Sequence, residues 1–179
     1  MLRFYYILPK TDIWRMMLRL LFIIFLNLSW IPATVSSYPD QLSGKVIGIV
    51  DGDTIDILYE GKALRIRLEH IDCPEIRKQQ PYGTAAKKFS ADLCFGKIVR
   101  ILHKNELDRN KRLIGEVIVP GGRSLNKELV KAGLAWHFTR YSKSEVYSSL
   151  EKAARKAGVG LWKEPHPVAP WNWRKPALK

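Results

Sequence analysis

Cysteine, acidic residues and repeated patterns are all scarce in this sequence. Only two cysteines occur among 179 residues, Cys73 and Cys94, and they are too few and too far apart for a zinc motif. The four histidines have no metal-ligand spacing either. Internal repeats and long low-complexity segments are lacking, so a single domain with a sizeable core is the expectation for this length.

A hydrophobic run of membrane-spanning length is also lacking. The apolar stretch Leu18–Ile31 is short for a span and contains two polar side chains. Basic residues precede it and the small residues 33–37 follow it, which is the order of a secretory signal. We therefore predict a leader over residues 1–37, cleaved near Ser36 or Ser37, with Met16 or Met17 as a possible true start. The product would be secreted or periplasmic, and an uncleaved leader that anchors the protein to a membrane is the alternative.

Export would permit a disulfide between Cys73 and Cys94. Two separate thiols are the other interpretation, because spacing alone does not supply disulfide geometry. The sequence leaves this choice open.

The shortage of acidic residues gives the chain a strong charge. Seventeen Asp and Glu face 30 Lys and Arg, for a formal net charge of +13. Only four of the basic residues lie in 1–37, so the excess belongs to the rest of the chain. A basic soluble protein with no special partner is one interpretation, and attraction to nucleic acid or to a membrane surface is the other.

Hydrophobic patterning predicts five short strands and three helices. The expected strands are 45–50, 54–59, 63–68, 97–102 and 114–119, and the expected helices are 81–94, 124–133 and 144–157. This order fits a five-stranded Greek-key barrel of the oligonucleotide-binding (OB-fold) type plus three α-helices, an α+β class. A sandwich with peripheral helices is the rival. We expect one domain over 38–164 and a Pro/Trp-rich tail over 165–179, either an ordered wrap or a loose end.

One acidic turn precedes the second predicted strand, and another follows the third. Asp51-Gly52-Asp53 precedes the hairpin and Asp72 follows it, so pairing of the two strands would bring Asp53 beside Asp72. Two close carboxylates repel unless a cation or proton joins them, and carboxylate, carbonyl and water oxygens suit Ca²⁺. Turn formation alone is the alternative for each aspartate.

Three further charged side chains are candidates for phosphate chemistry. Glu75, held after Pro74, is placed to accept a proton from water. Arg67 and Arg112 are candidates for bidentate phosphate contacts. For each of the three, an ordinary solvated side chain is the alternative.

Residues near these candidates are expected to help hold the substrate. Arg109 and Lys111 would add general attraction to nucleic acid. The rings of Tyr82, Tyr141 and Trp136 are candidates for stacking on bases, with core or rim packing as the alternative.

These residues form a long gapped pattern that closely resembles the thermonuclease family, the staphylococcal nuclease type. The first signature runs from Asp51-Gly52-Asp53-Thr54-Ile55 through Arg67-Leu68 to Ile71-Asp72 and Pro74-Glu75. Asp108-Arg109-Asn110 with Arg112 resembles the second. The resemblance covers residues 45–162.

The resemblance implies that Asp53 and Asp72 bind Ca²⁺, with the main-chain carbonyl of Cys73 as a further ligand. It implies that Arg67 and Arg112 contact the scissile phosphate and that Glu75 acts as base or orients the water. The implied activity is a calcium-dependent endonuclease and exonuclease that hydrolyses DNA and RNA with little sequence specificity and leaves 3′-phosphates. We expect a monomer with no stable protein partner, and the alternative is a non-catalytic nucleic-acid-binding OB-type module.

Three features depart from the family pattern. Cys73 stands where the best-known members have threonine, a change that a main-chain carbonyl ligand tolerates. Lys111 stands where a glycine often precedes the second arginine. The tyrosine associated with the nucleotide pocket has no clear counterpart, since gapless counting reaches Thr139 with Tyr141 nearby.

Overall fold

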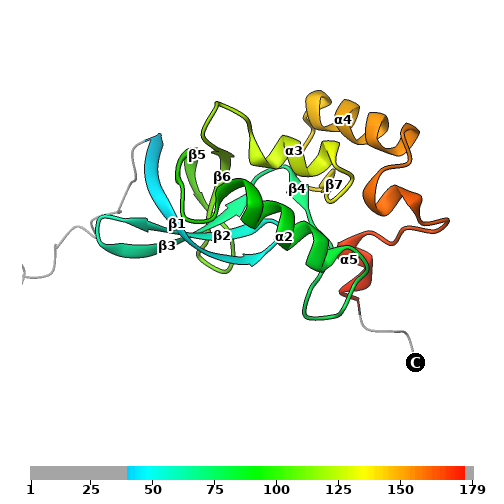
Figure 1. The fold of residues 1–179 in the computed structure, drawn as a ribbon, viewed down its shortest axis with the longest axis horizontal. Helices are drawn as coiled ribbons and strands as arrows, with labels where there is room; N and C mark the ends of the chain where they lie inside the picture. The colour runs from blue at the N-terminus through cyan, green and yellow to red at the C-terminus, as the bar shows by residue number, and fades with distance from the viewer. Residues whose placement is uncertain (1–39, 176–179) are drawn as a thin grey trace, which may run out of the picture. The chain divides into compact units, whose positions relative to one another are not determined.

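The structure is a computed structural model, and it describes residues 40–175 (Figure 1). The predicted leader lies outside the described residues, so its cleavage and the export of the protein stay predictions. Among the helices of residues 40–175, none is both long and apolar enough to cross a bilayer.

The described chain folds as a barrel with one helix inserted between its strands and the other helices after them. Its strands are β1 (Gln41–Asp51), β2 (Thr54–Tyr59), β3 (Lys62–Leu68), β4 (Ile71–Asp72), β5 (Ile98–Leu107), β6 (Leu113–Ile118) and β7 (Trp136–His137). Its helices are α2 (Gly83–Cys94), α3 (Leu125–Lys131), α4 (Glu145–Lys156) and α5 (Pro170–Trp173), with a 3₁₀ turn at Gly160–Lys163.

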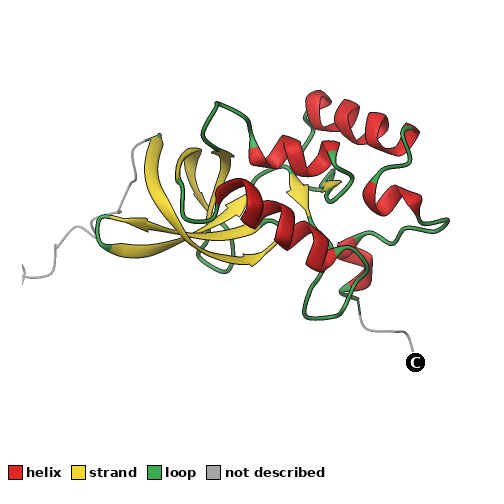
Figure 2. Cartoon of the chain, viewed as in Figure 1, coloured by secondary structure: helices red, strands yellow, loops and turns green. Residues whose placement is uncertain are grey.

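Five strands close into a barrel in the order β1-β2-β3-β6-β5, and β5 pairs back onto β1. The pairing of β3 with β6 is parallel, and the other pairs are antiparallel. Figure 2 shows these strands grouped on one side of the described chain and most of the helices on the other. The predicted five-stranded barrel with helices is confirmed.

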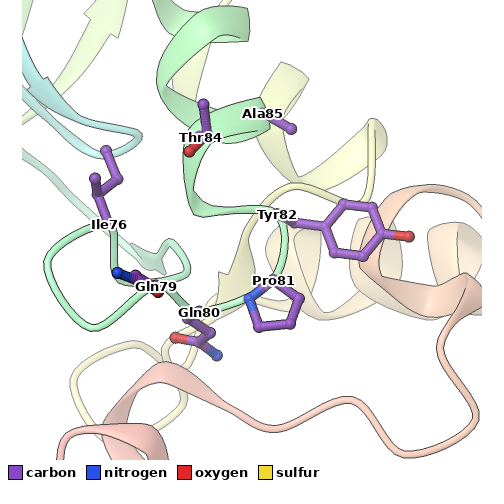
Figure 3. Close-up of a pocket in the computed structure, with 7 residues that line it drawn as sticks. All are labelled: Ile76, Gln79, Gln80, Pro81, Tyr82, Thr84 and Ala85. Atoms are coloured by element: carbon purple, nitrogen blue, oxygen red, sulfur yellow. The ribbon is translucent and has the colours of Figure 1, made fainter.

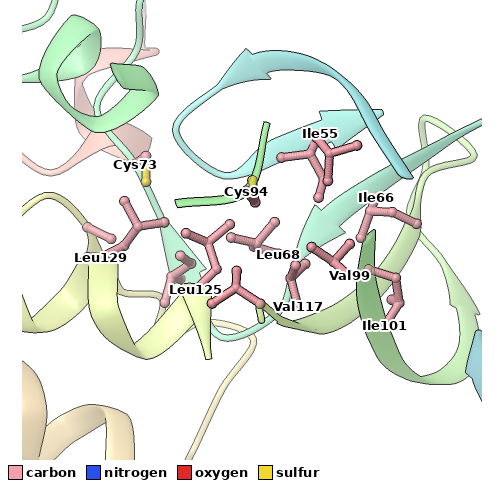
Figure 4. Packing of buried hydrophobic residues seen from close by; sticks show 14 of the residues in the cluster. Ile55, Ile66, Leu68, Cys73, Cys94, Val99, Ile101, Val117, Leu125 and Leu129 are labelled. Atoms are coloured by element: carbon pink, nitrogen blue, oxygen red, sulfur yellow. The ribbon is translucent and has the colours of Figure 1, made fainter. Parts of the chain in front are cut away.

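The core fills the barrel and extends to the inner faces of α2 and α3. Alternation along β2 and β3 buries Ile55, Ile57, Ile66 and Leu68 almost completely, because successive side chains of a strand point to opposite faces. Figure 4 shows Ile55, Ile66 and Leu68 packed with residues of β5, β6 and α3, and with Cys94 at the end of α2. Cys73 and Cys94 are free, buried thiols.

The three predicted helices form. The buried residues of α2 are Gly83, Ala86, Ser90 and Cys94, while Phe89 and Leu93 are partly buried and pack against the core cluster. Small side chains suit this face because α2 passes close to the turn after β1, where Ser90 Oγ donates to the carbonyl of Gly52 at 2.7 Å.

Two strand regions and a short sheet differ from prediction. β1 begins at Gln41, and β5 continues to Leu107 through residues expected to form a loop. A separate two-stranded ladder joins β4 to β7. This ladder pairs Asp72 with Trp136 and thereby fixes one end of the acidic segment that follows β3.

Gly133 allows the chain after α3 to pass against the 3₁₀ turn. Its φ is +66°, and a Cβ there would lie 2.2 Å from the carbonyl oxygen of Val159. We expect Gly133→Ala to lower the free energy of unfolding by about 2 kcal/mol more than Gly61→Ala does. Gly61 is the matched control, because its φ is +75° and no atom lies within 4 Å of the added Cβ. Urea unfolding of both variants measures the difference, and equal losses would contradict this packing.

Candidate active site

The turn between β1 and β2 carries the first two aspartates. Gly52 at its centre leaves no room for a side chain, because a Cβ there would lie 2.7 Å from that of Ala86. The main-chain N–H of Asp53 points to Asp51 Oδ1 at 3.4 Å. Asp53 itself is buried, and its Oδ1 accepts a hydrogen bond from Thr54 Oγ1 at 3.1 Å.

Arg67 joins the carboxylates of two separate segments. It lies on β3 directly opposite Thr54 of β2. Its Nη2 lies 3.2 Å from Asp53 Oδ2 and 2.9 Å from Asp72 Oδ1. Its Nη1 donates to the main-chain carbonyls of Leu68 and Ile71 at 2.8 and 2.9 Å. The hairpin therefore brings the two aspartates together, and one guanidinium group holds both of them.

The segment after β4 completes the acidic cluster, which consists of Asp51, Asp53, Asp72 and Glu75. The main-chain N–H of Cys73 donates to Asp53 Oδ2 at 2.6 Å. Two residues later, the N–H of Glu75 donates to Gln80 Oε1 at 3.0 Å, and Gln80 N–H returns a bond to the Glu75 carbonyl at 2.9 Å. These two bonds close the 75–80 loop, so Glu75 is held beside the aspartates at the cluster's half-exposed edge.

Burial and mutual repulsion disfavour the charged form of the aspartates in this cluster. Burial raises the pKa of Asp72 to about 6, and the nearby charge of Asp53 adds to the effect. Burial likewise raises the pKa of Asp51 to about 7, again with a contribution from Asp53. Although burial opposes it, the charges of Asp53 and Asp72 raise the pKa of Arg67. A further cation at this site would relieve the repulsion among the carboxylates.

Arg112 reaches the cluster through Thr54. Its Nη1 donates to Thr54 Oγ1 at 3.2 Å, while Nε and Nη2 contact Asp108 Oδ2 at 2.7 and 2.6 Å. Partial burial would raise the pKa of Asp108, but its bonds to Arg112 lower it overall. Asp108 and Thr54 therefore orient Arg112, and neither had been singled out from the sequence for this part.

Lys111 explains how the loop before Arg112 keeps its shape without glycine. Its φ is +59°, the left-handed conformation that glycine adopts most readily. Lys111 thus adopts the backbone conformation expected of the glycine that the family pattern often has at this position. Its side chain is exposed, as is that of Arg109.

Tyr141, predicted to stack on bases, contacts other side chains of the protein. Tyr141 is 75% exposed, and its ring contacts Phe138 edge-on at 4.8 Å and the guanidinium of Arg140 at 5.7 Å. His70, two residues before Asp72, bonds through Nδ1 to Ser142 Oγ at 2.9 Å. This contact and its packing on Tyr147 assign His70 to the structural contacts behind the site.

A hollow lies at the segment that follows Glu75 and leads into α2. It is lined by Ile76, Gln79, Gln80, Pro81, Tyr82, Thr84 and Ala85 (Figure 3). In the close-up Ile76 and Tyr82 lie on opposite sides of it. None of the carboxylates at 51, 53, 72 or 75 lines this hollow.

One cationic side chain at the site was missed entirely from the sequence. Arg174, beyond α5, places Nη2 at 2.6 Å from Asp72 Oδ2 and Nη1 at 2.5 Å from Glu75 Oε1. It lies outside every motif, so the only sequence signal was the basic character of the tail.

Comparison with known proteins places this arrangement in a family. The sequence profile described as "Staphylococcal nuclease homologue" matches residues 65–164, more than half of the chain. The chain belongs to the staphylococcal nuclease family. An uncharacterized endonuclease of Escherichia coli O157:H7 is 39% identical over 134 residues, which are 75% of this chain and 86% of that protein.

More distant members of the staphylococcal nuclease family also match. A micrococcal nuclease of Shigella flexneri is 38% identical over 143 residues, or 74% of this chain and 80% of that one. The staphylococcal-like nuclease CAN1 of Arabidopsis thaliana is 38% identical over 114 residues, which are 64% of this chain and 34% of that protein. These relatives support a nuclease activity for the chain.

The oxygen donors of the cluster fit the calcium ion that the staphylococcal nuclease family implies. Asp53 and Asp72 are buried side by side on Arg67 Nη2, and both supply the hard oxygens that Ca²⁺ prefers. Among residues 40–175, no group of three or more His, Cys, Asp or Glu side chains is arranged to hold a metal. The pair would therefore need carbonyl oxygen, with Cys73 as the predicted source, and water to complete the shell.

Proposed function

We propose that this protein is a calcium-dependent phosphodiesterase that hydrolyses DNA and RNA with little sequence specificity, acts as a monomer and leaves 3′-phosphates. The observation that carries the proposal is the convergence of Asp53, Arg67 and Asp72 beside Glu75. A binding module needs basic and aromatic side chains, but it does not need buried carboxylates that repel one another.

Each side chain has a distinct part in the proposed reaction. Bound Ca²⁺ would supply charge neutralisation at the phosphate. Asp53 and Asp72 would hold it, and their burial keeps them fixed at the base of the site. Arg67 and Arg112, each oriented by protein oxygens, would stabilise the charge that develops on the phosphate oxygens.

Glu75 would take the proton from the attacking water. Its side chain is 25% exposed, compared with 2% for Asp72, so of the two it is the one that solvent reaches. Attack in line with the bond to the 5′ oxygen would leave the phosphate on the 3′ oxygen. The basic surface would raise the local concentration of nucleic acid of any sequence.

A cleavage assay with and without calcium tests the proposal. We expect purified protein to degrade plasmid DNA and RNA when Ca²⁺ is present and to stop when a chelator is added. The products should become substrates for end-labelling at the 3′ end only after phosphatase treatment. Cleavage that survives chelation would contradict the role of the metal, and binding without cleavage would support the non-catalytic alternative.

A further inference from the structure

The C-terminal strap, residues 165–175, lies on the loop that carries Glu75. Gln80 Nε2 donates to the carbonyl of Val168 at 2.7 Å, and Trp173 Nε1 donates to that of Lys78 at 3.1 Å. Lys78 Nζ returns a bond to the carbonyl of Arg174 at 2.8 Å. Figure 1 shows α5 beside this loop. The strap is therefore attached directly to one wall of the site.

Aromatic packing fixes the same strap to the β7 region. Trp171 stacks on Phe138 with ring centroids 5.2 Å apart and planes at 7°, and it meets Trp136 edge-on at 5.7 Å. Ala169 and Pro170 are buried beside it. Packing of this kind holds a short segment in one place, so the side chain that follows α5 is delivered to a defined position.

That position puts the guanidinium of Arg174 on the acidic cluster. Nη1 and Nη2 contact Asp72 Oδ1 and Oδ2 at 3.2 and 2.6 Å, and Nη1 also contacts Glu75 at 2.5 Å. Although partial burial opposes it, Asp72 and Glu75 raise the pKa of Arg174. Asp72 Oδ1 already accepts from Arg67 at 2.9 Å. Both carboxylate oxygens of Asp72 are thus engaged by arginine N–H groups.

We propose that Arg174 competes with a divalent cation for Asp72 and so sets the cation affinity of the site. The inference rests on the proposed function, because it takes Asp72 as a cation ligand. A tethered guanidinium is present at high effective concentration, so a cation must displace it before it uses Asp72 fully. Both ions bind the same oxygens, and their coupling is negative.

Calcium titration followed by calorimetry tests the competition directly. We expect Arg174→Gln to bind Ca²⁺ about tenfold more tightly than the wild type, and Arg174→Lys to lie between them, since an ammonium group does not span both carboxylates. Lys175→Gln is the matched control: it removes the same charge from the next residue, and its affinity should stay within about twofold of the wild type. Thermal unfolding of each variant checks that it is folded.

A second variant loosens the strap without removing the charge. Trp171→Ala should also tighten Ca²⁺ binding, by less than Arg174→Gln, because the guanidinium is then less firmly held. Unchanged or weaker binding by Arg174→Gln would overturn the proposal and assign Arg174 to holding Asp72 and Glu75 in place for the cation. Failure of all the proteins to bind Ca²⁺ would overturn it together with the metal part of the proposed function. Tighter binding without any cleavage of DNA or RNA would support the competition and reject the nuclease.

Discussion

Replacing Glu75 by glutamine is expected to lower the rate of DNA cleavage by about 10²–10⁴-fold. Glutamine keeps the size of the side chain and an oxygen that accepts from Arg174, but it takes no proton at neutral pH. Affinity for DNA should change little, because Arg67 and Arg112 remain. Single-turnover cleavage with Ca²⁺ gives the rate, and fluorescence anisotropy with labelled DNA, with Ca²⁺ withheld by a chelator, gives the affinity.

Glu60→Gln is the control for this experiment. Glu60 lies at the turn joining β2 to β3, beyond the Tyr59–Lys62 pair, whereas the acidic cluster lies at the Thr54–Arg67 end of the same hairpin. The substitution Glu60→Gln removes the same charge as Glu75→Gln but lies away from the cluster, so the cleavage rate should match that of the wild type. Full activity of Glu75→Gln would remove Glu75 from the role of proton acceptor.

Replacing Arg67 by alanine is expected to damage stability and activity together. The substitution leaves Asp53 and Asp72 buried without their shared donor, and it removes the N–H groups that serve two main-chain carbonyls. Breaking a buried ion pair in this way costs about 3–5 kcal/mol. Urea unfolding measures that loss, and the cleavage assay should show little remaining activity.

Arg65→Ala separates these effects from a general loss of charge. Arg65 lies on the same strand, but its side chain is 52% exposed and pairs with Asp56 at 2.7 Å. An exposed pair contributes about 1 kcal/mol or less, so stability and cleavage should stay close to wild type. Arg67→Lys should keep more stability than Arg67→Ala and still lose cleavage, since lysine lacks the planar fork. Equal losses for Arg65→Ala and Arg67→Ala would contradict the central position of Arg67.

The ends of the strands show why local sequence pattern did not predict every boundary. Alternation of apolar residues predicted β2 as Thr54–Tyr59, the range found. β1 nevertheless begins four residues before the predicted Lys45, with Gln41 paired to Leu102 of β5. These first residues include polar side chains with weak strand preference, and pairing across the barrel makes them strand.

The residues of the candidate site also fall into two groups, those close together in the sequence and those brought together by the fold. Asp53, Arg67, Asp72 and Glu75 lie within one hairpin and the turn after it, so a short pattern was enough to place them near one another. Arg112 needed the parallel pairing of β3 with β6, which sets Arg67 beside Ile114. The exposed positions of Arg109, Lys111 and Tyr141 leave their predicted substrate contacts as predictions.

The pattern of residues along the chain was enough to predict the central barrel strands, the three main helices, the family and the nearness of Asp53 to Asp72. These features depend on periodicity and on residues close together in the chain, where spacing translates directly into position. The meeting of Arg174 with Asp72 and Glu75, across 102 and 99 residues of chain, became visible only in the folded protein. That contact depends on the packing of Trp171 and on the strap's bonds to the 75–80 loop, and no local pattern encodes where such a distant segment docks.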